Sequence, residues 1–304
     1  MKKLLLIDTF NFLHRAYHAL PKSFKNAQGE PTNAVYGVSS MLINVFDLIK
    51  PDYAIAALDG EKPTFRVEDF TGYKAHRKEI DNDLVVQIPK VFSVIDSFGI
   101  TKILLDGYEA DDVIGTVASK FASDELQVII ASNDRDLWQL VNKNVLILLP
   151  QTSGQAEWLS EREISARLGF DPIQIIDYKA LRGDLSDNIP GVHGIGEKTA
   201  KDLILAYGTL EEIYKNIVNI KPDSLKKKLA ESIDIAYLSK KLATIITDAP
   251  ISINLEDCKY TQFNRLKVVD EMKKHNFKSL VKRLGFDVEK PKESNVSANQ
   301  LSLL

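Results

Sequence analysis

The sequence predicts an α/β fold with a mostly parallel central sheet flanked by helices, followed by a helical region. Through the first half, short apolar runs alternate with longer amphipathic stretches, as they do in repeated strand–helix–strand units. The short runs are almost continuously apolar, which is typical of strands buried on both faces of a parallel sheet. After Trp158 the pattern changes to amphipathic helical segments separated by Gly and Pro.

The individual elements follow from these patterns. The expected strands are 3–7, 53–58, 102–105, 127–131 and 145–149. The expected helices are 34–49, 85–98 and 111–121 in the first half, and 160–168, 172–181, 197–206, 209–216, 223–230 and 231–243 in the second. From about residue 289 the chain is rich in Lys, Ser, Asn, Gln and Pro without an aromatic residue, so 289–304 is expected to be a flexible tail or linker.

Composition narrows the class of protein. The 304 residues are 44% hydrophobic and 27% charged, an ordinary globular balance for one large domain or two. The net charge of −3 gives no global basic field, and the single cysteine, Cys258, excludes a disulfide framework and a cysteine zinc site. No apolar stretch reaches the roughly 18 residues of a membrane span, and the run 4–7 is too short for a signal peptide. We expect a cytoplasmic protein without a membrane partner.

Acidic residues follow four of the five expected strands, where ligands bind in an open parallel sheet. Any single one is an ordinary loop or helix-cap residue. Together they would repel, since two like charges 4 Å apart cost about 4 kcal/mol at an effective dielectric of 20. Carboxylates without cysteine favour Mg²⁺ or Mn²⁺, and two such ions serve in-line phosphoryl displacement. The candidate ligands are Asp8, Asp59, Glu109, Asp111, Asp112, Asp134 and Asp136, with a further acidic pair at Asp184 and Asp187.

Two other segments carry groups suited to nucleic acid. Gly191, Gly194 and Gly196 precede Lys198 and Thr199, an arrangement that fits equally a backbone-phosphate clamp at a helix start and a tight helix–helix turn; the two final residues favour the clamp. Residues 62–90 mix acids and bases, as a solvated helix does. Their cluster at 73–78 nevertheless combines an aromatic ring with cations, as single-strand binders do. His14 is expected to be a packing or surface residue.

These motifs together resemble the bacterial 5′ nuclease family, which comprises the 5′→3′ exonuclease domain of DNA polymerase I and its stand-alone relatives. The resemblance covers about residues 1–286. Thr9 and Asn133 stand where the family usually has Gly, and neither position is a candidate ligand. The matching segments are 5–8 with Arg15, 57–59 leading to 64–66, 72–77, 107–113, 133–137 and 183–200.

The resemblance implies a PIN-like nuclease core over 1–158, with a helical arch at about 62–90 that the 5′ flap threads, and a helical DNA-binding region over 159–288. It implies that all nine acids form a two-metal centre, and that Lys74 and Arg77, with Tyr73, act on the phosphate. The 183–200 segment matches a helix–three-turn–helix clamp for duplex DNA, whose carbonyls are a candidate K⁺ site. The implied DNA contacts are Arg15, Arg66, Gly191, Gly194, Gly196, Lys198 and Thr199.

The expected function is a Mg²⁺-dependent, structure-selective 5′→3′ exonuclease and 5′-flap endonuclease, with Mn²⁺ as a substitute. Its partners would be DNA with 5′ flaps or 5′ ends, and RNA–DNA hybrids, in replication and repair. A monomer in the bacterial cytoplasm, associated with the nucleoid, is expected. Two alternatives stay open: an RNA-directed nuclease, and a catalytically inactive DNA-binding module, against which the nine intact acids argue.

Overall fold

The computed structural model describes residues 1–26, 28–60, 62–151, 156–260 and 263–286; the tail expected over 289–304 lies outside them. Its centre is a six-stranded sheet of order β3-β2-β1-β4-β5-β6. The first five strands pair in parallel and β6 pairs antiparallel with β5. The five predicted strands are confirmed as β1 (Lys2–Asp8), β2 (Tyr53–Leu58), β3 (Thr101–Leu104), β4 (Leu126–Ala131) and β5 (Val145–Leu149), and β6 (Glu157–Leu159) was not predicted.

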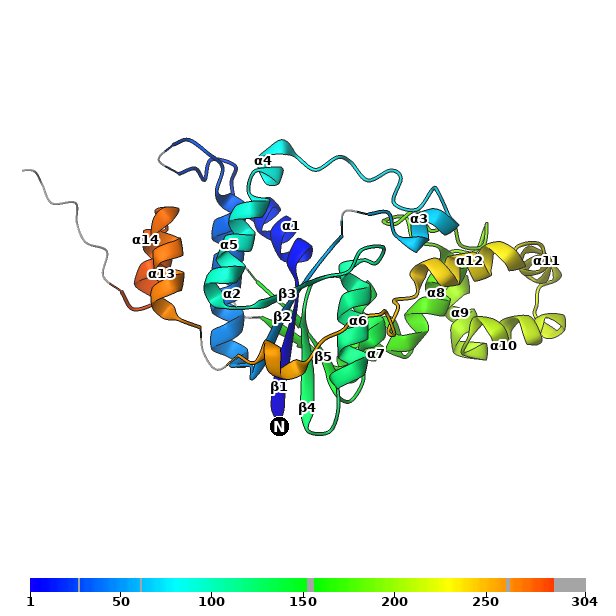
Figure 1. The fold of residues 1–304 in the computed structure, drawn as a ribbon. Helices are drawn as coiled ribbons and strands as arrows, with labels where there is room; N and C mark the ends of the chain where they lie inside the picture. Colours follow the sequence, from blue (N-terminus) through cyan, green and yellow to red (C-terminus); the bar gives the residue numbers. More distant parts are fainter. Residues whose placement is uncertain (27, 61, 152–155, 261–262, 287–304) are drawn as a thin grey trace, which may run out of the picture.

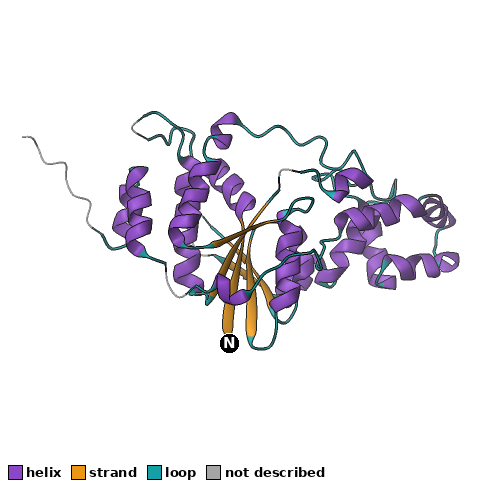
Figure 2. Ribbon diagram, in the orientation of Figure 1, coloured by secondary structure: helices purple, strands orange, loops and turns teal. Residues whose placement is uncertain are grey.

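Both faces of the sheet are covered by helices (Figures 1 and 2). Alternate residues of β1 point to opposite faces: Leu5 and Ile7 pack among helices on one side, and Leu4 and Leu6 among those on the other. This explains why the strands are apolar throughout. The first side carries α1 (Thr9–Ala19), α2 (Asn33–Ile49), α5 (Ile88–Phe98), α13 (Arg265–Lys274) and α14 (Lys278–Arg283), and the second carries α6 (Ala110–Phe121), η1 (Asp136–Leu140) and α7 (Glu161–Leu168).

The helical region extends from the α6 side of the sheet (Figure 1). All the helices predicted there occur within a few residues of their expected bounds, except that Pro172 begins a 3₁₀ turn before α8. After α12 the chain returns past η4 to the sheet, and α13 then packs against α5. The elements are η2 (Pro172–Gln174), α8 (Ile175–Arg182), α9 (Glu197–Tyr207), α10 (Leu210–Lys215), η3 (Ile217–Asn219), α11 (Asp223–Glu231), α12 (Ile233–Ala243) and η4 (Leu255–Cys258).

The segment 62–90 crosses above the carboxyl ends of the strands, between α3 (Phe65–Asp69) and α4 (Asn82–Val85) (Figure 1). Residues 70–81 between these two short helices are not helical, unlike the expected helical arch. A short, mixed-charge segment with little apolar packing gains too little to offset helix nucleation. Instead, the Lys74 N–H donates to the Asp187 carbonyl at 2.9 Å, and Lys74 takes a positive φ of 53°.

The described helices include none with the combined length and hydropathy needed to cross a bilayer.

Candidate active site at the carboxyl edge of the sheet

Five of the predicted acids meet at one hollow above the carboxyl ends of the strands. The hollow has a volume of about 710 Å³, and each acid reaches it from the end of β1 or from the loop or helix start after β2, β3 or β4. The convergence follows from the parallel topology, which places all these strand ends at one edge. The acids lining it are Asp8, Asp59, Glu109, Asp111 and Asp134.

Asp8 is the most deeply placed of these acids, with 5% of its surface exposed. Its carboxylate accepts the Asn11 N–H, which caps α1, and the Ser132 hydroxyl at 2.7 Å. Burial raises the pKa of Asp8 to about 7, with smaller contributions from the charges of Asp134 and Asp59. The two hydrogen bonds therefore stabilise the charged form only in part.

Asp111 lies at the start of α6 and faces Asp8 and Asp134. Burial raises its pKa well above the ordinary range, and the charges of Asp134 and Asp8 add to the effect. Asp59 accepts the Ala110 N–H at 2.8 Å. The carboxylates of the hollow thus repel one another, and a cation among them would relieve that repulsion.

The remaining acids are paired with basic side chains. Lys179 of α8 lies between Asp136 and Asp184 and contacts both. Burial raises the pKa of Asp136 to about 6 against the effect of Lys179, whereas for Asp184 the same lysine outweighs burial and lowers the pKa. Asp187 pairs with Arg77 at 2.5 Å.

Glu109 connects the hollow to the segment above it. Its carboxylate lies 2.9 Å from the Lys74 ammonium and accepts the Tyr73 hydroxyl at 3.2 Å. Burial lowers the pKa of Lys74, but the charges of Glu109 and Asp187 outweigh it and the pKa is raised. Lys74 is therefore a fully charged cation at the rim of the hollow.

Asp112 does not line the hollow. It is fully buried, and its carboxylate accepts hydrogen bonds from both terminal nitrogens of Arg66, at 2.7 and 2.8 Å. Arg66 is 2% exposed and also donates to the carbonyls of Leu242 and Thr244. The prediction that Arg66 contacts DNA is therefore wrong: the motif showed the residue but not its burial, and its donors are used inside the protein. Arg15 is half-buried and donates to Gln151.

Within the described ranges, no three His, Cys, Asp or Glu side chains form a ready-made metal-binding group. Lys74, Lys179 and Arg77 pair with Glu109, Asp136, Asp184 and Asp187. The donor set nevertheless fits a hard divalent cation, because the groups left facing one another, Asp8, Asp111 and Asp134, are all carboxylates.

The glycine turn between α8 and α9 has the conformation that the pattern suggested. Gly191 has a φ of 63°, and a Cβ there would lie 2.2 Å from the Gly183 nitrogen, so only glycine fits. Gly194 also has a positive φ, and Gly196 is the N-cap residue of α9. Lys198 is exposed and Thr199 half-buried in the first turn of that helix. The N-terminus of α9 is open to solvent, as a phosphate contact requires.

Some side chains in this region were not predicted to be part of it, among them His14 and Lys179. His14, expected to be a packing or surface residue, lines the hollow together with Phe10. It lies on α1 six residues after Asp8, about 1.7 turns, so its spacing from that acid did not indicate a shared face. Lys179 bridges two acids that are 48 residues apart in sequence, and no local pattern indicates such a partner.

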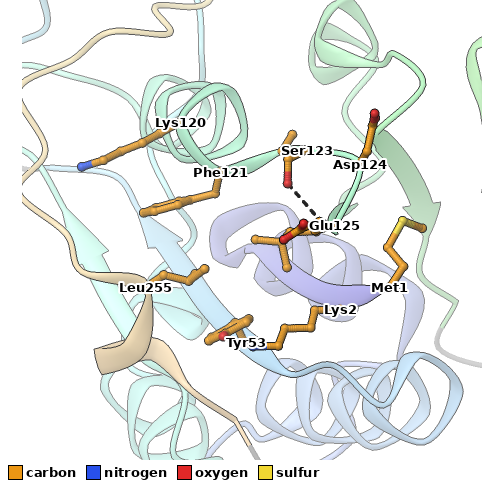
Figure 3. A pocket seen from close by; sticks show the side chains of 11 residues that line it. Met1, Lys2, Tyr53, Lys120, Phe121, Ser123, Asp124, Glu125 and Leu255 are labelled. Carbon is orange, nitrogen blue, oxygen red and sulfur yellow. Dashed lines mark hydrogen bonds between the residues drawn. The ribbon is translucent and has the colours of Figure 1, made fainter.

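A second pocket, of about 790 Å³, lies at the opposite edge of the sheet (Figure 3). Tyr53, Phe121 and Leu255 line it, with Lys2 beside the Tyr53 ring. It contains none of the predicted site residues.

Comparison with known proteins gives two family matches. Residues 3–169 match the family described as "5'-3' exonuclease, N-terminal resolvase-like domain", and residues 170–266 match "5'-3' exonuclease, C-terminal SAM fold". The chain is 40% identical over 286 residues to DNA polymerase I of Caldicellulosiruptor bescii, covering 93% of this chain and 33% of that protein. It is 35% identical to the 5'-3' exonuclease of Aquifex aeolicus, covering 93% and 96%. The chain thus spans about a third of the length of the polymerases it matches.

Solved structures of similar fold include the T5 D15 protein co-crystallised with metal ions, with a TM-score of 0.67, 20% identity and coverage of 93% of this chain and 97% of that one. Another is the catalytic core of Rad2 in complex with DNA substrate, with a TM-score of 0.57, 16% identity and coverage of 90% and 88%. At these identities the likeness concerns the fold.

Proposed function

Since the chain belongs to the 5′-3′ exonuclease family, we propose that it is a Mg²⁺-dependent nuclease that hydrolyses DNA phosphodiesters at 5′ ends and 5′ flaps. The observation that carries the proposal is the hollow at the carboxyl edge, where carboxylates face one another without enough neutralising charge. RNA–DNA hybrids as further substrates, Mn²⁺ as a substitute, a monomeric state and a place at the bacterial nucleoid in replication and repair are parts of the same proposal.

Bound Mg²⁺ ions would supply Lewis-acid stabilisation of the attacking and leaving oxygens. The residues that would hold them are the five carboxylates lining the hollow, together with Asp136, Asp184 and Asp187 beside it. Lys74 would leave Glu109 when that carboxylate turns toward an ion, and its ammonium would then neutralise charge developing on the phosphate. Arg77, 55% exposed and paired with Asp187, would hold a neighbouring phosphate.

The deciding experiment compares Mg²⁺-dependent digestion of a 5′-flap duplex, a blunt duplex and single strands, with matched DNA and RNA flaps. We expect products with 5′-phosphates from the DNA flap in Mg²⁺ and Mn²⁺, and none in EDTA. Faster cutting of the RNA flap would favour an RNA-directed nuclease. Tight binding of flap DNA without cutting in either ion would favour an inactive DNA-binding module.

The glycine turn and the start of α9 would hold the duplex by its backbone, without reading sequence. Lys198→Ala should reduce the slope of log affinity against log salt by about one, because one phosphate contact is lost. The slope is measured in Ca²⁺, which blocks cutting, and the exposed Lys215 on α10 provides a control substitution. An unchanged slope for Lys198→Ala would remove this residue from the phosphate contacts.

K⁺ at the turn is a finer part of this proposal. The Lys228 ammonium already donates to the Gly194 carbonyl at 3.2 Å, so the two cations would compete for that oxygen. The test compares flap affinity in K⁺ with that in Na⁺ at equal ionic strength, in the wild type and in Lys228→Ala. It distinguishes a K⁺ ion from the Lys228 ammonium as the cation at the Gly194 carbonyl.

A further inference from the structure

We propose that Asp112 is a positioning residue that holds Glu109 and the segment 242–246 in place through Arg66, and that it is not a metal ligand. The inference rests on the proposed function, because it divides the nine acids of the nuclease site by role. It departs from the assignment that the family resemblance implied, in which Asp112 joined the metal centre.

The hydrogen-bond capacity of the Asp112 carboxylate is full. Oδ1 accepts from Arg66 at 2.8 Å and from the Ile246 N–H at 2.9 Å. Oδ2 accepts from Arg66 at 2.7 Å and from the Glu109 N–H at 3.0 Å. A carboxylate has about four lone-pair positions, so none is left for an ion. The side chain is also fully buried, whereas Asp111 beside it reaches the hollow.

The pair joins three parts of the molecule. Arg66 belongs to α3, at the foot of the segment that crosses above the strands, and Asp112 belongs to the first turn of α6. The Arg66 donors to Leu242 and Thr244 fix the chain where it leaves α12. Helix α12 packs on α8, which leads into the glycine turn. One buried contact therefore fixes the relative positions of the segment 62–90, the acids of the hollow and the proposed duplex-binding region.

Glu109 is the acid that this arrangement orients. Its N–H is held by Asp112, the reciprocal half of a capping box, and its carboxylate lies 3.6 Å from the Arg66 guanidinium. Without the pair, Glu109 would keep its contacts with Lys74 and Tyr73. It would lose the backbone hydrogen bond to Asp112 and the nearby Arg66 guanidinium, which orient it. Gln139 still donates to the Ala243 carbonyl and accepts the Ile245 N–H, so the segment would shift without being released.

The test measures Mn²⁺ binding by calorimetry and single-turnover and steady-state cleavage of a 5′-flap duplex. The variants are Asp112→Asn, Arg66→Met and the double variant. Asp112→Asn should bind Mn²⁺ with the stoichiometry of the wild type and within threefold of its Kd, whereas Asp111→Asn, the neighbouring control, should weaken it more than tenfold. In Asp112→Asn, kcat should fall tenfold or more, with KM for the flap within threefold.

Arg66→Met should lose a similar factor in kcat, and the double variant no more than either single one, because both residues act through one contact. Asp177→Asn controls for stability alone: Asp177 is buried and pairs with Lys240 at 2.6 Å away from the hollow, so its kcat should stay within twofold of the wild type. If Asp112→Asn does not fold, the double variant decides, since it leaves no buried charge unpaired.

Loss of a Mn²⁺ site in Asp112→Asn or in the double variant, to the extent seen in Asp111→Asn, would overturn the inference. So would multiplicative losses of kcat in the double variant. Failure of the wild type itself to bind Mn²⁺ or to cut the flap would instead contradict the proposed function.

Discussion

Replacing Asp134 with asparagine should remove most Mg²⁺-dependent cleavage of 5′-flap DNA while leaving the fold intact. Asp134 lines the hollow beside Asp8 and Asp111 and raises the pKa of both. Loss of one carboxylate that would hold a metal ion should remove several kcal/mol of transition-state stabilisation and so lower kcat about 10³-fold. The measurement is single-turnover cleavage at saturating protein.

The same variant should be at least as resistant to heat as the wild type in EDTA, because one of several like charges has been removed. Asp124→Asn is the matched control, since Asp124 lies on the surface at the opposite edge of the sheet and pairs with Lys143. Its cleavage rate should equal that of the wild type. Cleavage by Asp134→Asn within tenfold of the wild type would exclude Asp134 from the metal-holding set.

Lys74→Ala should lower the cleavage rate by about 10²–10³-fold while weakening flap binding far less. The structure gives the reason: the Lys74 ammonium lies at the rim of the hollow, 2.9 Å from Glu109, and its backbone is held by Asp187. A cation that acts mainly in the transition state lowers kcat and kcat/KM together.

The control for Lys74→Ala is Lys62→Ala. Lys62 lies at the start of the segment 62–90 but pairs with Asp106 at the surface, outside the hollow. It should cut at the wild-type rate. If Lys74→Ala at saturating substrate cuts within threefold of the wild type, the ammonium has no part in the chemistry.

The sheet was predictable because burial on both faces leaves a continuous apolar run, as at 128–131. Strand β6 was not, since three residues, only one of them buried, carry no such signal. Helix α1 was also missed, although its buried residues recur at helical spacing from Phe12 to Tyr17.

For the site, topology alone predicts which acids meet, because strand ends of a parallel sheet share an edge. It does not predict their partners. Arg66 and Asp112 belong to neighbouring motifs in the sequence, but their burial depends on how α3, α6 and the end of α12 pack together. The bridge made by Lys179 between Asp136 and Asp184 depends in the same way on the placement of α8.

The return of the chain from α12 to the sheet determines how the helical region is attached. The Tyr260 N–H donates to the Asp52 carbonyl at 2.6 Å, and α13 and α14 then pack beside α2 and α5. The region is thus an insertion with two covalent connections to the α/β core, one between α7 and η2 and one after α12. A single proteolytic cut within it leaves both fragments anchored in the same hydrophobic core, and two cuts are needed to release it. For the same reason, one connection alone does not form a hinge, and any swing of the glycine turn must bend both connections together.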